Sequence, residues 1–175
     1  MARIDESIAF VPVHIAVLTV SDTRDEAADT SGRLLVERAT AAGHKVLHKQ
    51  IVTDDAEQIL IAVHRFLADP EVDVVISTGG TGVTQRDVTT EVFRALYDKE
   101  IEGFGELFRW LSFKHVGTST IQSRATAGVA RGKYLFALPG STGACRDGWD
   151  EILVHQLDSR HKPCNFVELM PRLAR

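Results

Sequence analysis

The chain has 175 residues, of which 44% are hydrophobic and 25% are charged, and this balance is typical of a globular protein of one domain (residues 1–175). The formal net charge of −4 argues against nucleic acid as a partner, because nucleic-acid binding needs a basic surface. No apolar run approaches the roughly 20 residues of a membrane span, and the N-terminal stretch lacks the pattern of an export signal. We therefore expect a cytoplasmic protein without a membrane partner.

The first half of the chain alternates strand patterns with helix patterns. "VHIAVLTV" (Val13–Val20) is rich in β-branched residues and predicts a buried strand. The next segment spaces its apolar residues as a helix does, with Thr30 or Ser31 as the expected cap and Gly43 as the stop. A second strand, a second helix and a third strand are predicted at residues 44–52, 54–69 and 72–78.

The second half continues this alternation. A helix is predicted from about Thr89 to Asp98, a short strand at 133–138 and a closing helix at 141–160. An amphipathic helix at 103–117 carries Phe104, Leu107, Phe108 and Leu111 on one side, which we expect to be core, with an oligomer interface as the alternative. Trp110 and Trp149 lie on apolar helix faces, and we interpret both as core or subunit-contact residues.

This order of elements predicts an α/β fold with three layers, in which helices cover both faces of a mostly parallel sheet. Ligands of such sheets bind beyond the carboxyl ends of the strands. Four loops rich in Ser, Thr, Gly or Asp are predicted at that edge: Ser21–Thr30, Thr53–Asp55, Ser77–Asp87 and Pro139–Ser141.

The stretch "STGGTG" after the third strand is the most distinctive of these loops. Gly79, Gly80 and Gly82 can take positive φ angles, so consecutive backbone N–H groups can converge on an anion, and Thr78 and Thr81 add hydroxyl groups. The spacing is that of neither a P-loop nor a dinucleotide-binding fingerprint. Two readings remain open, a tight strand-to-helix turn and a phosphate-binding loop.

Aspartates follow two of the strands. Asp87 is either a helix cap, with Thr89 as the alternative cap, or a carboxylate that holds Mg²⁺ beside bound phosphates. Asp54 and Asp55 both fit a capping pattern that needs only one of them. In a parallel sheet these loops share one edge, so Asp54 is expected to face Asp87 as a metal ligand or as a base.

Other residues carry weaker signals. The polar loop after the first strand and the segment 117–128, with its Ser-Arg pair, are each either a solvated loop or an anion site. Cys145 and Cys164 lie far apart in no metal-binding spacing and are expected to be free thiols. The seven histidines show no metal-binding motif.

The order of several motifs adds a resemblance. "TVSDTR", "DTSG", "STGGTG", "RDVT", "GFGELFR", "TSTIQSRATAG" and "LPGSTGA" follow one another as in the MoaB/Mog family of molybdenum cofactor biosynthesis. The chain resembles this family from about Val13 to Leu157. The resemblance implies the molybdopterin-binding-domain type of α/β fold, a molybdopterin ligand and assembly as a homo-oligomer, either trimer or hexamer. In active members, ATP with Mg²⁺ adenylylates the terminal phosphate of molybdopterin; a non-catalytic carrier or scaffold is the alternative.

The resemblance also implies roles for individual residues. It assigns phosphate and nucleotide binding to Thr78, Gly79, Gly80, Thr81, Gly82, Pro139, Gly140 and Ser141. It assigns molybdopterin binding to Thr19, Ser21, Thr23, Ser123 and Arg124. Asp87 and Asp54 match the aspartates expected to be catalytic and to hold Mg²⁺. The chain departs from many relatives at Thr90, where they have proline, and at Gln85, and neither departure removes a reacting group.

Overall fold

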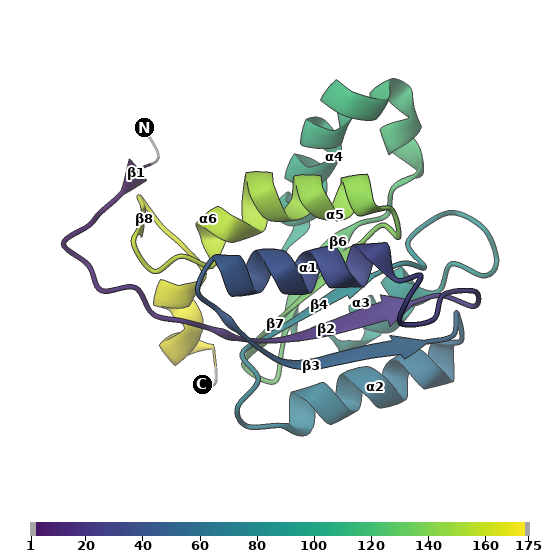
Figure 1. Ribbon diagram of the computed structural model, residues 1–175, viewed down its shortest axis with the longest axis horizontal. Helices are drawn as coiled ribbons and strands as arrows, with labels where there is room; N and C mark the ends of the chain where they lie inside the picture. The colour runs from purple at the N-terminus through teal and green to yellow at the C-terminus, as the bar shows by residue number, and fades with distance from the viewer. Residues whose placement is uncertain (1–2, 174–175) are drawn as a thin grey trace.

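A six-stranded sheet forms the centre of the molecule (Figure 1). The computed structural model describes residues 3–173, so the first two and last two residues of the expected domain 1–175 lie outside the described residues. The strands of the sheet are β2 (His14–Val20), β3 (Lys45–Val52), β4 (Val74–Thr78), β5 (Lys99–Glu100), β6 (Thr126–Ala130) and β7 (Lys133–Leu138). A separate antiparallel pair joins β1 (Arg3–Ile4) to β8 (His161–Lys162).

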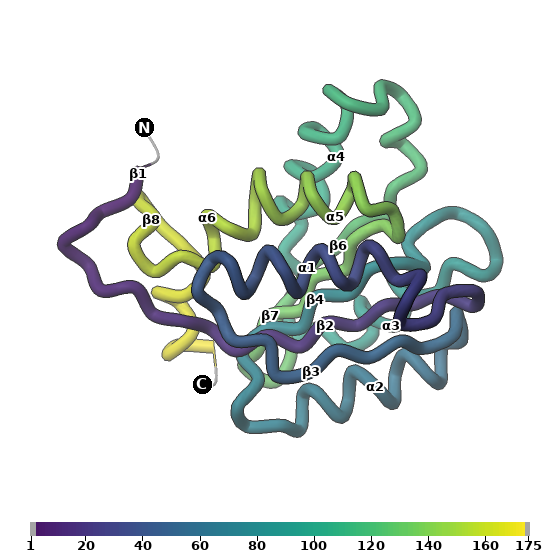
Figure 2. The backbone as a smooth tube through the Cα atoms, in the orientation of Figure 1, coloured from purple at the N-terminus to yellow at the C-terminus, as the bar shows by residue number. Residues whose placement is uncertain are grey.

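The strands lie in the order β3-β2-β4-β7-β6-β5. The first four run parallel to one another, whereas β6 and β5 are antiparallel and form one edge. The expected mostly parallel sheet is therefore confirmed. The loops after β2, β3 and β4 emerge together at one end of the sheet, as Figure 2 shows.

Helices cover both faces of the sheet. They are α1 (Thr30–Ala41), α2 (Ala56–Ala68), α3 (Thr89–Leu96), α4 (Glu102–Val116), α5 (Thr142–Gly148) and α6 (Val154–Gln156). Shorter helical turns are η1 (Gly117–Gln122), η2 (Trp149–Leu153, with π geometry) and η3 (Val167–Arg172). None of the helices in the described part of the chain is both long enough and apolar enough to cross a membrane.

Strand β2 shows how the sequence produces three layers. Ile15 and Val17 belong to the hydrophobic cluster under α1, α4 and α5, whereas Ala16 and Leu18 belong to the cluster under α2 and α3. Alternate side chains of a strand point to opposite faces, so a continuous apolar run is buried on both sides. The predicted three-layer α/β fold is therefore confirmed.

The segment 117–128 is more regular than we expected. Its first half forms η1 and its end begins β6, which pairs with β7 through a two-residue hairpin turn. Arg131 and Gly132 in that turn both have positive φ angles, 49° and 77°. Such a turn suits the twist of an antiparallel hairpin. The sequence "TAGVA" of β6 is short and rich in small residues, which hides the strand from pattern analysis.

Helix ends also differ from the predictions. Asp29, rather than Thr30 or Ser31, caps α1, because its carboxylate accepts a hydrogen bond from the Gly32 N–H. Asp54 and Asp55 were both candidates to cap the second helix. Asp55 caps α2, because its carboxylate accepts a hydrogen bond from the Gln58 N–H. The closing helical segment ends at Gln156, with the η2 turn inside it, rather than at residue 160.

Helix α4 buries fewer apolar side chains than we predicted. Phe104, Phe108 and Leu111 lie in the core, but Leu107 is 42% exposed and Trp110 is 63% exposed. The core expectation is thus wrong for Leu107, and Trp110 is left with the second of its two interpretations, a subunit contact, because the apolar surface of α4 is wider than the face that meets the sheet.

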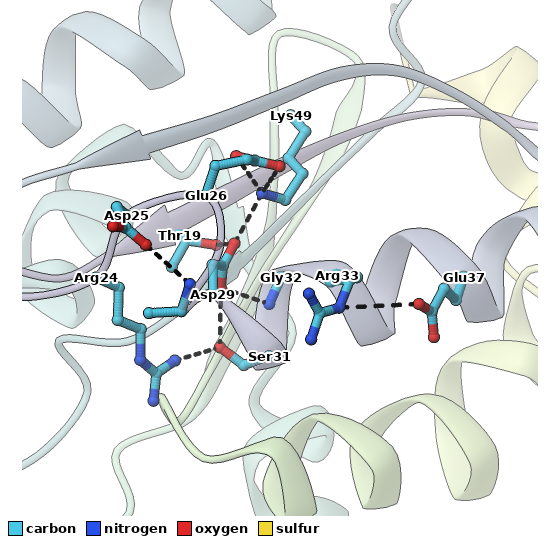
Figure 3. Close-up of polar contacts among 11 residues, drawn as sticks. Thr19, Arg24, Asp25, Glu26, Asp29, Ser31, Gly32, Arg33, Glu37 and Lys49 are labelled. Atoms are coloured by element: carbon cyan, nitrogen blue, oxygen red, sulfur yellow. Dashed lines mark hydrogen bonds and ion pairs between the residues drawn. The ribbon is translucent and has the colours of Figure 1, made fainter.

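A buried polar network holds the N-terminus of α1 against the sheet (Figure 3). Asp29 is fully buried, and its carboxylate accepts hydrogen bonds from the Thr19 hydroxyl at 2.9 Å and from Gly32. The ammonium of Lys49 on β3 lies 2.9 Å from the same carboxylate and 2.7 Å from Glu26. The network therefore joins β2, β3 and α1 at the edge where the loops gather.

The ionised state of Asp29 is favoured by these contacts. Burial acts to raise the pKa of Asp29, but the hydrogen bonds from Lys49, Gly32 and Thr19 outweigh it, so the pKa lies below its ordinary value of 3.8. A carboxyl group with a lowered pKa stabilises the fold above its unfolded pKa. This contribution is lost as the pH falls through the folded-state pKa.

We predict that Asp29→Asn, which keeps the shape and a capping oxygen, lowers the free energy of unfolding by about 2–3 kcal/mol at pH 7 because Lys49 loses its buried partner. The difference from the wild type should shrink below pH 4, where the carboxyl group of the unfolded chain becomes protonated, and should vanish once the pH falls below the lower pKa of the folded state. Urea unfolding at a series of pH values measures both effects. Equal stability of the two proteins at pH 7 would contradict the proposed contribution of this network to the free energy of unfolding.

Candidate functional site

A cavity of about 970 Å³ opens where the parallel strands end. This volume is that of a small-molecule site. Its walls come from the loop after β2, the glycine loop after β4, the turn after β7, the α4–η1 region and α5. Three of the four loops singled out in the sequence thus line one cavity, and the fourth, Thr53–Asp55, lies beside it.

The glycine loop is shaped by close backbone contacts. Gly79 and Gly80 have φ angles of 104° and 65°. A Cβ atom on Gly79 would lie 2.1 Å from the carbonyl oxygen of Val20, and one on Gly80 would lie 2.2 Å from the hydroxyl of Thr89. Only glycine fits both positions. Gly79, Gly80 and Gly82 consequently line the cavity with backbone alone, and Thr81 between them is buried and also lies in the lining.

Asp87 lies at the rim of this loop and faces the cavity. Its carboxylate accepts hydrogen bonds from the N–H of Thr84 at 2.9 Å and from the Thr84 hydroxyl at 2.6 Å. Of the two alternatives for Asp87, the helix cap is wrong, because α3 begins after Val88 and has no side-chain cap from Asp87 or Thr89. Asp87 instead closes the end of the glycine loop.

The protonation state of Asp87 follows from these contacts. Burial acts to raise the pKa of Asp87, but hydrogen bonds from Thr84 and Gly82 outweigh it, and the charge of Arg124 acts with them. The pKa lies below its ordinary value of 3.8, so this carboxylate carries a full negative charge at neutral pH.

Asp54 has the opposite environment. Its Oδ1 atom is buried and has no hydrogen-bond partner among the described residues. Burial raises the pKa of Asp54, and the charges of Asp22 and Asp87 raise it further. The two aspartates expected to face each other are thus close enough to interact electrostatically, although Asp54 lies behind Gly80 rather than in the cavity wall.

A second buried oxygen adjoins Asp54. The hydroxyl of Thr89 is also buried without a partner among the described residues. It and Asp54 Oδ1 lie 2.2 and 2.7 Å from the point where a Cβ on Gly80 would stand. Hard oxygen atoms of this kind suit Mg²⁺. In the described part of the chain no three His, Cys, Asp or Glu residues form a metal-binding group, so phosphate and water oxygens would have to complete the ion's shell.

Arg124 holds the glycine loop in place. Its guanidinium donates to the carbonyl oxygens of Gly82 at 2.5 Å and Asp87 at 2.7 Å, and it pairs with Glu91. The backbone N–H of Arg124 donates to the carbonyl oxygen of Thr81 at 3.0 Å. Arg124 therefore lies behind the loop and outside the cavity lining, whereas its neighbour Ser123 faces the cavity.

Thr90, which stands where many members of the family have proline, makes a hydrogen bond near the glycine loop. The Thr90 hydroxyl donates a 3.0 Å hydrogen bond to the Arg124 carbonyl oxygen, a contact that a proline at this position lacks. This bond ties the start of α3 to the segment before β6.

The predicted hydroxyl groups divide into exposed and buried sets. Ser21 and Thr23 line the cavity, as do Pro139, Gly140 and Ser141, with Ser141 also capping α5. Thr19 is fully buried and donates to Asp29, and Thr78 is fully buried and donates to the carbonyl of Pro139 at 3.0 Å. These last two residues do not reach the cavity and support its loops from below.

His115, Arg146 and Asp147 carried no signal in the sequence, whereas Arg24 belongs to the polar loop after the first strand that offered an anion site. Arg24, His115, Arg146 and Asp147 all face the cavity. His115 on α4 and Asp147 on α5 approach to 2.9 Å across it. Of these residues only Arg24 lies in a recognisable motif, "SDTR"; the others belong to helices whose packing the sequence pattern does not reveal.

Comparisons with known proteins identify the family of this chain. Residues 16–159 match the family described as "Probable molybdopterin binding domain". The chain is 51% identical over 160 residues to molybdenum cofactor biosynthesis protein B of Escherichia coli (strain K12), covering 91% of this chain and 94% of that protein.

Solved structures give the same result. A crystal structure of molybdenum cofactor biosynthesis protein B has a TM-score of 0.86 and 42% identity, covering 95% of this chain and 98% of the other. The tungsten cofactor synthesizing protein MoaB from Pyrococcus furiosus has a TM-score of 0.78 and 34% identity, covering 94% and 98%. The family match and the alignment with the Escherichia coli protein both cover most of the chain. The chain therefore belongs to the molybdopterin-binding-domain family of molybdenum cofactor biosynthesis, and within it to the MoaB proteins.

Proposed function

We propose that this protein binds molybdopterin and transfers the adenylyl group of ATP to its terminal phosphate, giving adenylyl-molybdopterin and pyrophosphate. The observation that carries this proposal is the pair of aspartates with opposite environments at one end of the glycine loop. Asp87 is held ionised by hydrogen bonds, whereas Asp54 keeps a buried oxygen without a partner among the described residues. Carboxylates placed next to a phosphate-binding loop are typical of sites that hold Mg²⁺ with a nucleotide.

The reaction itself needs little covalent help from the protein. An oxygen of the molybdopterin phosphate attacks the α-phosphorus of ATP, and the bond from that phosphorus to the bridging oxygen of pyrophosphate breaks. Both reactants are anions, so the protein's main tasks are to align them and to offset their charge. In our proposal the backbone of Gly80–Gly82 binds the nucleotide phosphates, while Ser21, Thr23 and Ser123 bind the pterin side.

Magnesium would be held by Asp87 and Asp54, and when bound it would neutralise charge on the phosphates. The Thr89 hydroxyl is a further oxygen within the same pocket of buried polar atoms. The remaining contribution of the chain is geometric, because Arg124 fixes the loop that carries these groups.

A non-catalytic molybdopterin carrier is the alternative function. One observation favours it: the Asp87 carboxylate already accepts two hydrogen bonds from Thr84, so it has a structural task within the loop. A carrier needs the pterin-side hydroxyls and does not need Asp87 to act on a metal.

We also propose that the chain forms a homo-oligomer through the exposed apolar side of α4 and η1. Trp110, Phe113 and Ile121 are 63%, 55% and 82% exposed, and Leu107 lies on the same helix. A group of large apolar side chains on adjoining elements favours a protein contact over isolated surface exposure.

For the reaction, we predict that Asp87→Asn lowers the rate of adenylyl-molybdopterin formation by about 100-fold or more, the size of effect seen when one preorganised electrostatic group is lost. Asparagine keeps an oxygen for Thr84, so the loop should stay folded. Product is measured in a single turnover with molybdopterin and MgATP, together with the melting temperature.

Asp55→Asn is the matched control, because Asp55 lies at the same edge and asparagine is also a good helix cap. It should retain the wild-type rate. A folded Asp87→Asn protein that forms product at the wild-type rate would refute the catalytic role of Asp87. Binding of molybdopterin by the wild type without any product would establish the carrier.

For assembly, we predict that Trp110→Glu reduces the molar mass in solution, because a charge in a desolvated contact is unfavourable. Light scattering after size-exclusion chromatography measures the mass. Ile61→Glu is the matched control, since Ile61 is an exposed apolar residue of similar exposure, 55%, on α2. An unchanged mass for Trp110→Glu, with the wild type oligomeric, would exclude this surface.

A further inference from the structure

Arg24 is a cavity residue to which the proposed reaction has so far given no role. It follows β2 in the loop that contains Ser21 and Thr23, and it lines the cavity. Its guanidinium donates to the Ser31 hydroxyl at 2.6 Å and to the carbonyl oxygen of Gly140 at 2.8 Å. The side chain is half-buried between the start of α1 and the turn after β7.

The charge of Arg24 is not balanced by a carboxylate. Among residues 3–173, no acidic group lies within ion-pair distance of its guanidinium. The neighbouring arginines differ in this respect, because Arg86 pairs with Asp22 and Arg124 pairs with Glu91. A half-buried cation held only by neutral acceptors favours an anionic ligand, which would supply the missing counter-charge.

Arg24 also has donors to spare. A guanidinium carries five N–H groups in one plane, and the two contacts with Ser31 and Gly140 use one each from Nη1 and Nη2. Three donors remain. A planar fork of this kind suits the oxygens of a phosphate group, which it can bind through two parallel hydrogen bonds.

A chain of contacts fixes the position of this side chain (Figure 3). Ser31, which accepts from Arg24, lies 3.5 Å from the Asp29 carboxylate. Asp29 is in turn held by Lys49 and Thr19. The orientation of Arg24 is therefore set by a buried network that reaches back to β3. Such preorganisation lowers the entropy that a flexible arginine would lose on binding an anion.

We propose that Arg24 binds a substrate phosphate group in this cavity and that Ser31 is the residue that positions it. The inference rests on the proposed function for the identity of the substrate. The phosphate has two possible sources, the terminal phosphate of molybdopterin and the phosphates of ATP. Arg24 belongs to the same loop as Ser21, whose hydroxyl accepts from the backbone N–H of Arg24 at 3.2 Å, and this place in the pterin-side loop assigns Arg24 to molybdopterin.

The test compares Arg24→Gln with the wild type in equilibrium binding, once with molybdopterin and once with a non-hydrolysable ATP analogue plus Mg²⁺. Glutamine can still donate to Gly140 but carries no charge. We expect the Kd for molybdopterin to rise about 10- to 100-fold and its dependence on salt to become shallower, with little change in the melting temperature. The Kd for the ATP analogue should stay within about threefold of the wild type.

Arg33→Gln is the matched control. Arg33 lies on the first turns of α1, is about half exposed and pairs only loosely with Glu37 at 3.9 Å, away from the cavity. Figure 3 shows it directed along the helix rather than toward Arg24. This variant changes the net charge by the same amount and should bind both ligands as the wild type does.

Ser31→Ala tests the positioning role. It should weaken molybdopterin binding several-fold without lowering the melting temperature, and Ser31→Thr, which keeps the hydroxyl, should restore the affinity. A loss of binding that appears only together with a loss of stability in every Ser31 variant would contradict positioning.

The outcomes separate this inference from the proposed function. If Arg24→Gln binds both ligands as tightly as the wild type, the inference is wrong. If only the ATP analogue binds more weakly, Arg24 is a phosphate-binding residue for the nucleotide and its assignment to molybdopterin is overturned. If the wild type binds no molybdopterin, the proposed function fails, and Arg24 is then judged by the ATP analogue alone.

Discussion

The close approach of the glycine loop to the end of β2 is the constraint on which the site depends. The Gly79 backbone comes so near the carbonyl oxygen of Val20 that no side chain fits between them, and Gly80 lies directly over Asp54 and Thr89. Because of this approach, the loops after β2, β4 and β7 share one cavity instead of three separate surfaces. Arg124, which lies outside the cavity lining, holds the glycine loop in this position by donating hydrogen bonds to the carbonyl oxygens of Gly82 and Asp87.

The distribution of charge around the loop follows from the same packing. Asp87 is hydrogen-bonded and ionised, Asp54 lies behind Gly80 with a raised pKa, and Arg24 in the loop after β2 is held by Ser31. Anionic and cationic groups thus flank the cavity from different strands. In the proposed reaction the aspartates would serve the metal-bound phosphates and Arg24 the pterin phosphate, so that the two reactants are aligned in one cavity.

Much of the fold could be predicted because apolar patterns report burial directly. The run from Val13 to Val20 is continuous because β2 is covered on both faces. Strand β6 was missed because its small residues carry little strand preference, and its existence depends on pairing with β7. At the site, the order of the loops along the chain predicted which segments meet. The hydrogen bonds that Asp87 accepts from Thr84 and the burial of Thr19 could not be predicted, because they depend on three-dimensional packing and not on the spacing of residues in the sequence.

The central claim is that the adenylyl group moves from ATP to molybdopterin on this protein, and transfer of an isotopic label measures it most directly. Purified wild-type protein is incubated with molybdopterin, Mg²⁺ and ATP labelled either at the α- or at the γ-phosphorus. The proposed reaction predicts that the α-label appears on the pterin product and the γ-label in pyrophosphate. Molybdopterin that remains bound and unlabelled after complete incubation would contradict it and leave the protein as a carrier.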